Sequence, residues 1–513
     1  MSKSNKIAKS AMMISIFTLV SKFLGFIREM LIASKYGSGY ETDTYFVAMT
    51  ATTIIMTTIG SSLNTSLIPV FTEVEEKKGK KAKIRFLNNI LNVIFFITII
   101  LVILGFFLSP LIIKMVAGGF KGEQFKLAVE LNRIGLPIVI FLGFTYVFSG
   151  FLHSSQIFGP PAIMGLPYNL VFIIFLLFMA DKENIYTLML ASVVASSTQF
   201  LIQVPAVRHQ GFRYKVDADL NDVYIRKTLL LVFPVLIGSA VQQINTIVDK
   251  TLASGLAEGS ISALNYSAKL NDVVVSVFIA AITTVIFPML SRAFAQGDDD
   301  QLKLIMSQGI NIILLITVPA TIGIMILAEP IVRIFFERGE FNASDTLMTS
   351  SALFFYSLGL VSISLRLMLN KVFYSLQDTK TPMINGALSV GLNIILNLIF
   401  IRFMDHAGLA LATSISTTFT SIMLFISLRN KIGPIGLKRY LRCLVKTLAA
   451  SLVMGVVVYF TFYGLTESYE FSKVFEMLIL LLSIGLGALV YFILCLIFDI
   501  KELKILLSGI RRK

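Results

Sequence analysis

The sequence predicts an all-α protein that crosses a membrane many times. Hydrophobic residues make up 56% of the 513 residues and charged residues only 14%, whereas a soluble domain carries roughly 25% charged residues. The mean hydropathy is +0.82. Backbone groups in lipid must be paired internally, so that spans are helices or closed barrels. The apolar runs have the length of about 20 residues that a helix needs to cross a bilayer, and they lack the short alternation of barrel strands.

Fourteen apolar segments are expected to be spans. They lie at 11–33, 43–71, 87–113, 127–151, 157–180, 186–206, 228–254, 261–290, 304–335, 345–375, 382–403, 406–428, 443–463 and 475–499. The first resembles a signal peptide, because Lys3, Lys6 and Lys9 precede it. Its apolar run is interrupted by charge and continues past signal length, with no small-residue cleavage site, so we expect a retained span.

Loop charges predict the orientation of the spans. Basic residues cluster after even-numbered spans, on the side of the N-terminus, at 77–85, 208–227, 429–442 and 511–513. The loops on the other side, such as 34–42 and 257–260, are short and hold few cations. The positive-inside rule therefore predicts that both termini are cytoplasmic. Because the net charge of +14 is spread over such short loops, it does not indicate nucleic-acid binding.

An internal repeat is visible at an offset of about 220 residues. The segment SSQIFGPP from Ser154 resembles SLQDTKTP from Ser375, and Pro69 corresponds to Pro288. An even number of spans separates the copies, which predicts two lobes of the same orientation, with a substrate site between them. The expected domains are an N-lobe (1–206), a C-lobe (207–428) and two additional helices with a cytoplasmic tail (429–513).

Nothing in the sequence predicts an enzyme. The acidic run Asp298–Asp300 is the nearest candidate for a catalytic cluster, and it is typical of a solvated turn. Cys443 and Cys495 lie in apolar runs and are interpreted as small core residues. The three histidines show no metal-ligand spacing.

Charged residues inside apolar spans are the strongest functional signal. Each costs at least ~2.5–3.5 kcal/mol at mid-span and so suggests function. Lys22, Arg28 and Glu29 lie in the first span, Asp43 begins the second, and Lys269 lies in the eighth. Lys22 and Arg28 could face one cavity, whereas Glu29, as the next residue, is expected to point elsewhere. A cationic set drawn from both lobes would suit a phosphate or diphosphate. Internal ion pairs or snorkelling side chains are the alternative.

A second set of polar residues supplies oxygen ligands. Asn393 and Asn397 share a face of the eleventh span, Thr413 lies in the twelfth, and Asp249 lies in the seventh. Carboxylate, amide and hydroxyl oxygens suit a hard cation. The alternative is that these amides and hydroxyls only join helices by hydrogen bonds.

Four segments resemble the MurJ/MviN lipid II flippases, which belong to the multidrug/oligosaccharidyl-lipid/polysaccharide exporter superfamily. They are Ser21–Ala48, Leu131–Ala162, Ile331–Thr346 and Lys371–Pro382. The resemblance extends over all fourteen spans. It implies two six-helix lobes, two extra helices lining a hydrophobic groove, and export of an undecaprenyl-diphosphate-linked peptidoglycan precursor.

The resemblance also implies roles for single residues. Arg28 corresponds to a cavity arginine, Glu29 to the acid beside it, and Asp43 to the acid of a TD-[AT]-[FY]-F-V-A motif. Lys22 and Lys269 stand where many members have arginine. The resemblance thus implies that these five residues bind the substrate. A further cavity arginine is missing, because 52–62 carries no charge. The family's sodium site falls on Asp249, Asn393, Asn397 and Thr413, with a backbone contribution near Leu409, although one type of member has an acid where Asn397 stands.

The sequence therefore predicts a lipid II flippase of the bacterial plasma membrane that works by alternating access, with no cofactor except a sodium ion. Lipid II and membrane lipids are the expected partners, and cell-wall synthesis enzymes are further candidates. Three alternatives stay open: a flippase for another lipid-linked oligosaccharide, a cation-coupled multidrug exporter, and a scaffold of a cell-wall complex. The buried cations argue against the exporter, because cationic drugs favour an acidic or aromatic cavity.

Overall fold

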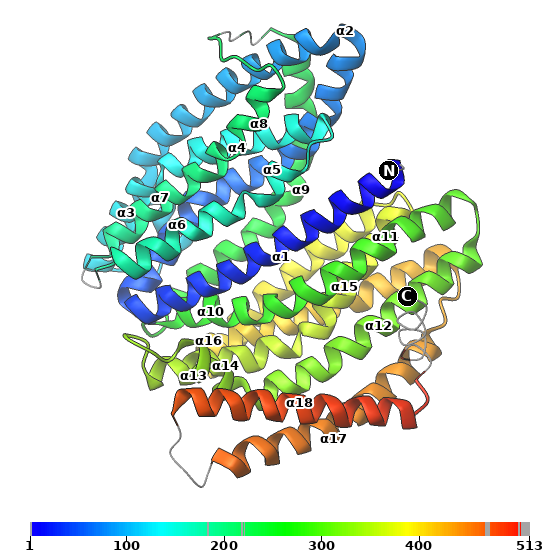
Figure 1. Cartoon of the computed structure of the whole chain (residues 1–513). Helices are drawn as coiled ribbons and strands as arrows, with labels where there is room; N and C mark the ends of the chain where they lie inside the picture. The colour runs from blue at the N-terminus through cyan, green and yellow to red at the C-terminus, as the bar shows by residue number, and fades with distance from the viewer. Residues whose placement is uncertain are drawn as a thin grey trace. The chain divides into compact units, whose positions relative to one another are not determined.

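The computed structural model describes residues 3–181, 184–216, 219, 221–466, 472–500 and 503. They fold into helices, and no strand occurs among them (Figure 1). The basic tail Arg511–Lys513, used above for orientation, lies outside the described residues. The chain forms two compact units, 1–262 with 339–341, and 263–338 with 342–513. The contacts thus place the seventh predicted span in the first unit, whereas the lobe boundary predicted at 206/207 rests on the sequence repeat.

The first unit consists mainly of nine helices in its described part. They are α1 (Lys3–Tyr36), α2 (Tyr40–Val116), α3 (Gly122–Gly135), α4 (Pro137–Ser154), α5 (Gly159–Ile163), α6 (Gly165–Phe178), α7 (Ile185–Leu201), α8 (Val204–His209) and α9 (Val223–Ala253). α2 contains two predicted spans, because Gly79 breaks it with φ 79° and ψ 173°. α2 packs against α4 and α9, and α1 packs against α6. Phe71, Phe86 and Phe151 meet edge to face in the core of this unit.

The second unit contains the remaining described helices, except for the first three residues of α10, which belong to the first unit with Asp43. They are α10 (Ser260–Val274), a π-helical turn (Val275–Ile279), α11 (Ala280–Ala295), α12 (Asp299–Ile326), α13 (Ala328–Phe336), α14 (Ala343–Leu358), α15 (Leu360–Ser375), α16 (Lys380–Ile432), α17 (Leu437–Thr466) and α18 (Lys473–Ile497). α16 also holds two predicted spans, broken at Asp405 with φ 47°. Cys443 and Cys495 are buried in the apolar core of the second unit.

Helices occupy all fourteen predicted segments. Within the described residues, eight helices are long and apolar enough to cross a membrane, or up to ten if each of two bent pairs is one span. The bent pairs are α10 with α11, at 43°, and α14 with α15, at 45°. Two of the eight, α2 and α16, each cover two predicted segments, so the arrangement is consistent with fourteen spans. The all-α, polytopic fold is confirmed.

The repeated motif forms the same turn in both units. Gln156 and Gln377 have φ angles of 58° and 57°, in the left-handed region that non-glycine residues rarely occupy. In each turn, the next backbone amide donates to the carbonyl five residues before it at 2.9 Å. The hydroxyls of Ser154 and Ser375 each donate to the carbonyl three residues back at 2.7 Å. The two turns therefore share backbone geometry as well as sequence, as a parallel repeat requires.

Each turn is held by an ion pair outside the apolar spans. In the first unit Lys83 is only 1% exposed, and its ammonium donates to Glu75 at 2.6 Å and to Ser155 at 2.8 Å. In the second unit Lys431 donates to Asp378 at 2.5 Å. That hydrogen bond, with backbone help from Thr381, lowers the pKa of Asp378 to about 2. Lys83 is therefore a buried structural residue. From the sequence, it served only as one of the basic loop residues that predict the orientation of the spans.

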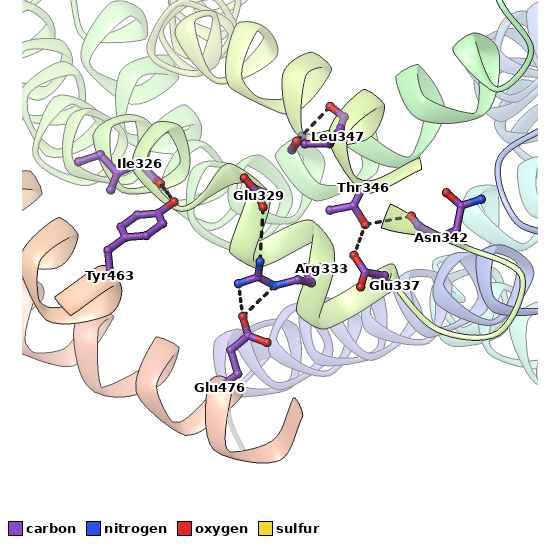
Figure 2. A network of polar contacts seen from close by, with 10 residues as sticks. Ile326, Glu329, Arg333, Glu337, Asn342, Thr346, Leu347, Tyr463 and Glu476 are labelled. Atoms are coloured by element: carbon purple, nitrogen blue, oxygen red, sulfur yellow. Dashed lines mark hydrogen bonds and ion pairs between the residues drawn. The ribbon is translucent and has the colours of Figure 1, made fainter. Parts of the chain in front are cut away.

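The C-terminal pair α17 and α18 is joined to α13 by charged residues. The Arg333 guanidinium on α13 donates through Nε to Glu476 on α18 at 2.8 Å, and its Nη2 contacts the same oxygen (Figure 2). The more exposed Glu329 accepts from Nη1 at 3.4 Å. The Tyr463 hydroxyl on α17 donates to the carbonyl of Ile326. These contacts fix one end of the additional pair.

Replacing Glu476 with glutamine is expected to lower the free energy of unfolding of the second unit by about 1 kcal/mol. The pair is partly exposed, so solvent screens it, but two N–H groups share one carboxylate oxygen. Thermal unfolding in detergent, followed by helix signal, measures the change. Glu329→Gln is the matched control, with little effect because its contact is long and exposed. An equal loss in both variants would contradict a special role for Glu476.

Candidate functional site

Arg28 lies on α1, and its side chain contacts the adjacent Glu29 and residues of α6. Its Nη1 donates to Asn169 Oδ1 at 3.1 Å, and its Nη2 donates to Glu29 Oε1 at 2.6 Å. The rings of Tyr168 and Phe172 lie 5.3 and 5.2 Å from the guanidinium carbon, at cation–π distance. The side chain is 16% exposed. These side chains fix the orientation of a cation that is largely removed from solvent.

The sequence of both helices allows this arrangement. Ser21, Gly25 and Arg28 recur at helical spacing and share one face of α1. The Asn169 amide donates to the carbonyl of Ser21 at 2.9 Å, which turns its oxygen toward Arg28. A Cβ atom at Gly165 would lie 2.1 Å from the Ser21 hydroxyl, so that glycine lets α6 approach α1 closely.

The expectation that Glu29 points away from Arg28 is wrong. Adjacent Cα positions on a helix differ by about 100°, but the long arginine side chain bends round the helix to reach the carboxylate. Glu29 is 3% exposed, and the pair therefore offsets much of the cost of a buried charge. Among the described residues, Asn169 and Glu29 receive hydrogen bonds from two of the five N–H groups of Arg28. A further anion could use the others.

Asp43 caps the start of α10. Its carboxylate accepts from the backbone amides of Gly259 and Ser262 at 2.8 and 2.7 Å, and from the Ser262 hydroxyl at 2.5 Å. The residue is 3% exposed. Gly259 has a φ of 88°, where glycine is favoured, and its carbonyl accepts from the Ser38 hydroxyl. Both carboxylate oxygens are thus already engaged, which suits a positioning role better than direct contact with a substrate.

The remaining predicted cations are less constrained. Lys22 is exposed on α1, and Lys269 is half-buried on α10. Lys22 belongs to the first unit with Arg28, and Lys269 to the second. Each is described within its own unit, and the shared cavity stays a prediction.

Arg366 on α15 is a candidate that the sequence analysis missed. It is half-buried within the tenth predicted span, and no described carboxylate pairs with it. The rule that selected Arg28, an ionisable residue inside an apolar span, would have selected it as well. Its neighbour in the same helix, Lys371, packs over the ring of Phe287 at 5.2 Å. Arg366 is therefore a half-buried arginine within a predicted span of the second unit, although it does not correspond to Arg28 in the repeat.

The second unit brings three of the four predicted sodium ligands together. Asn397 Nδ2 donates to Asn393 Oδ1 at 2.9 Å, and Asn393 Nδ2 donates to the Thr413 hydroxyl at 3.4 Å. Both asparagines are buried, and Thr413 donates to the carbonyl of Leu409 at 3.0 Å. Asp249 belongs to the first unit, where it accepts from Asn245 at 3.1 Å.

The chemistry of this oxygen set fits a hard monovalent cation. Amide, hydroxyl and backbone oxygens meet within one unit, although they now hydrogen-bond to one another. A transition-metal site is a different matter: within the described residues, no group of three or more His, Cys, Asp or Glu side chains could hold a metal ion.

Comparison with known proteins gives one consistent result. The family model described as "Lipid II flippase MurJ" matches residues 32–482. A probable lipid II flippase MurJ from Vibrio cholerae is 31% identical, over 82% of this chain and 83% of the relative. One from Buchnera aphidicola subsp. Acyrthosiphon pisum is 28% identical, over 88% of this chain and 89% of the relative.

Solved structures agree with the sequence matches. A lipid II flippase MurJ in an inward closed conformation superimposes with a TM-score of 0.79 at 28% identity, covering 95% of this chain and 98% of the other. An inward-facing multidrug-resistance transporter of the MATE family superimposes with a TM-score of 0.68 at 14% identity, covering 82% and 98%. The second match concerns the fold alone.

Proposed function

We infer the function from one premise: the chain belongs to the MurJ family of lipid II flippases. The protein is a lipid II transporter and not an enzyme, and it resides in the membrane as a multi-pass protein. Its substrate carries a diphosphate, a sugar–peptide head group and a prenyl tail. The mechanism must therefore offer a polar path to the head group while the tail stays in lipid.

We propose that Arg28 binds the diphosphate. The observation that supports this proposal is the fixed orientation of its guanidinium. Its guanidinium is oriented by Asn169 and Glu29 before any ligand arrives, so little ordering entropy is lost when an anion binds. A guanidinium can bind a diphosphate through two parallel hydrogen bonds. Lys22 and Lys269 would add positive charge for the diphosphate.

Translocation would follow alternating access, as expected for a transporter built from two repeats. The head group enters from the cytoplasmic side, the prenyl tail remains along α17 and α18, and movement of the repeats exposes the site outward. Cytoplasmic termini follow from the loop charges. Cell-wall synthesis enzymes that use the exported precursor are natural partners.

Complementation tests the substrate assignment. A strain depleted of its own lipid II flippase should regain growth when this chain is expressed. Failure of rescue despite good expression in the membrane would favour another lipid-linked oligosaccharide. Rescue by a stable Arg28→Ala protein would instead favour a non-transporting scaffold.

We also propose that Asn393, Asn397 and Thr413, together with Asp249, bind sodium. Asn397→Ala is expected to weaken sodium binding at least tenfold, because each lost oxygen ligand is replaced by apolar surface. Isothermal titration of purified protein with sodium chloride, against choline chloride, measures it. Asn385→Ala is a control, because Asn385 lies on the same helix and contacts Ser427 instead. Unchanged sodium affinity in Asn397→Ala would contradict the site.

A further inference from the structure

The first unit contains a largely apolar cavity. Its volume is about 660 Å³, within the range of small-molecule sites. Residues of α2, α4, α7, α8 and the segment 212–214 line it, and five of them are phenylalanines: Phe95, Phe144, Phe148, Phe200 and Phe212. None of the residues that contact Arg28 takes part, so the cavity is separate from the proposed diphosphate site.

The phenylalanines form a continuous aromatic wall. Phe144 and Phe148 contact Phe200 with ring centroids 5.3 and 5.1 Å apart. Phe95 stacks on Phe144 at 6.0 Å, and Phe212 meets Phe148 edge to face at 5.8 Å. Such a surface offers water few hydrogen-bond partners, so it favours an apolar ligand over ordered water. The phenylalanine-lined part of the cavity therefore fits a hydrocarbon chain.

The cavity opens onto a surface of exposed apolar side chains. Phe95 and Leu201, which line it, are themselves exposed, and Phe96 and Ile100 continue the exposed apolar face along α2. A surface of this kind within predicted spans faces lipid chains. A lipid can therefore reach the cavity from within the bilayer.

Two arginines line the cavity as well. Arg208 and Arg213 are exposed, and no described carboxylate pairs with either. Both belong to the basic loop after the sixth span, on the side that the positive-inside rule assigns to the cytoplasm. Arginine pairs suit phosphate groups, which they bind through bidentate hydrogen bonds.

Buried asparagines on α2 hold the arginine segment in place. Asn88 Oδ1 accepts from the amide of Lys215 at 2.7 Å, and its Nδ2 donates to the carbonyl of Arg213 at 3.1 Å. Asn92 donates to the carbonyl of Lys215 and accepts from the Tyr214 hydroxyl at 2.6 Å. Arg213 is thus anchored to α2, and Arg208 lies on α8, so that this cationic rim of two arginines is not carried on a free loop.

We propose that this cavity binds one anionic glycerophospholipid of the cytoplasmic leaflet. An acyl chain lies against the phenylalanines, and the phosphate contacts Arg208 and Arg213. A zwitterionic head group would bring its ammonium group to the same cationic rim and is disfavoured. The site would fix the first unit to an anionic membrane surface, and it does not depend on the diphosphate site.

The chain contains no tryptophan, which makes a direct test available. A single tryptophan introduced by Phe200→Trp reports on the cavity, and brominated acyl chains quench it on contact. The full-length protein in phosphatidylcholine nanodiscs is titrated with brominated phosphatidylglycerol or brominated phosphatidylcholine. We expect quenching at a lower mole fraction of phosphatidylglycerol, with the preference falling about fivefold for each arginine removed by Arg208→Ala or Arg213→Ala.

The controls separate this site from general lipid contact. Phe107→Trp, at an exposed position on α2, should be quenched equally by both lipids. Leu201→Trp at the cavity edge replaces Phe200→Trp if the latter fails to fold. Equal quenching by both lipids, or a preference that survives the double arginine variant, would overturn the proposal. Displacement of phosphatidylglycerol by inorganic phosphate or by undecaprenyl phosphate would overturn the choice of a glycerophospholipid.

Discussion

Arg28→Ala is expected to abolish rescue of a strain that lacks its own flippase and to weaken lipid II binding on the order of 100-fold. The estimate corresponds to the loss of about 2–3 kcal/mol, the contribution of hydrogen bonds between charged partners in a poorly solvated site. Arg28→Lys should bind with intermediate affinity, because an ammonium keeps the charge but loses bidentate geometry. Binding of lipid II and of undecaprenyl diphosphate to purified protein measures both variants.

Loss of Arg28 also leaves Glu29 buried without its cation, and this could lower stability by itself. The double variant Arg28→Ala/Glu29→Gln removes that unpaired charge. We expect it to recover thermal stability but not lipid II binding. Arg133→Ala is a matched control, because Arg133 also packs over a ring, that of Phe106 at 4.7 Å. Binding by Arg28→Ala equal to that of the wild type would refute the assignment.

Local patterns were sufficient to predict the helices and the repeat. Apolar runs of span length became helices because lipid-exposed backbone must be paired internally. The turn at Gln156 and its copy at Gln377 were found from sequence identity at a fixed offset, and the structure gives both the same left-handed geometry. Arg28 stood out for an equally local reason, the cost of a charge inside an apolar run.

The partners of those charges could not be predicted in the same way. Asn169 reaches Arg28 across 141 positions of sequence, and no periodicity links α1 to α6. The contact between Arg28 and Glu29 depends on the bend of one side chain, which helical spacing does not determine. Arg366 is different, because an arginine inside an apolar run is a signal that the sequence itself carries.

Asp43 illustrates a role that only the structure reveals. Its motif suggested a substrate-binding acid, but its carboxylate lies against the first turn of α10, more than 200 residues later in the chain. A carboxylate at a helix N-terminus accepts hydrogen bonds from amides that have no partner within the helix, and it interacts favourably with the helix dipole. Sequence spacing gives no sign of such a distant cap.

Asp43→Ala is therefore expected to lower the free energy of unfolding by on the order of 3–5 kcal/mol, because it leaves buried amides of Gly259 and Ser262 without an acceptor. Asp43→Asn should also lower the free energy of unfolding, by a large part of this amount, since an amide nitrogen would replace one acceptor oxygen. Ser262→Ala is the matched control and removes only the hydroxyl contact, at about 1 kcal/mol. Thermal unfolding and the yield of monodisperse protein measure the series.

A structural cap lowers stability and lipid II binding together, and binding should return at temperatures where the variant remains folded. An Asp43→Ala protein with wild-type thermal stability and no lipid II binding would instead make Asp43 a direct ligand of the substrate.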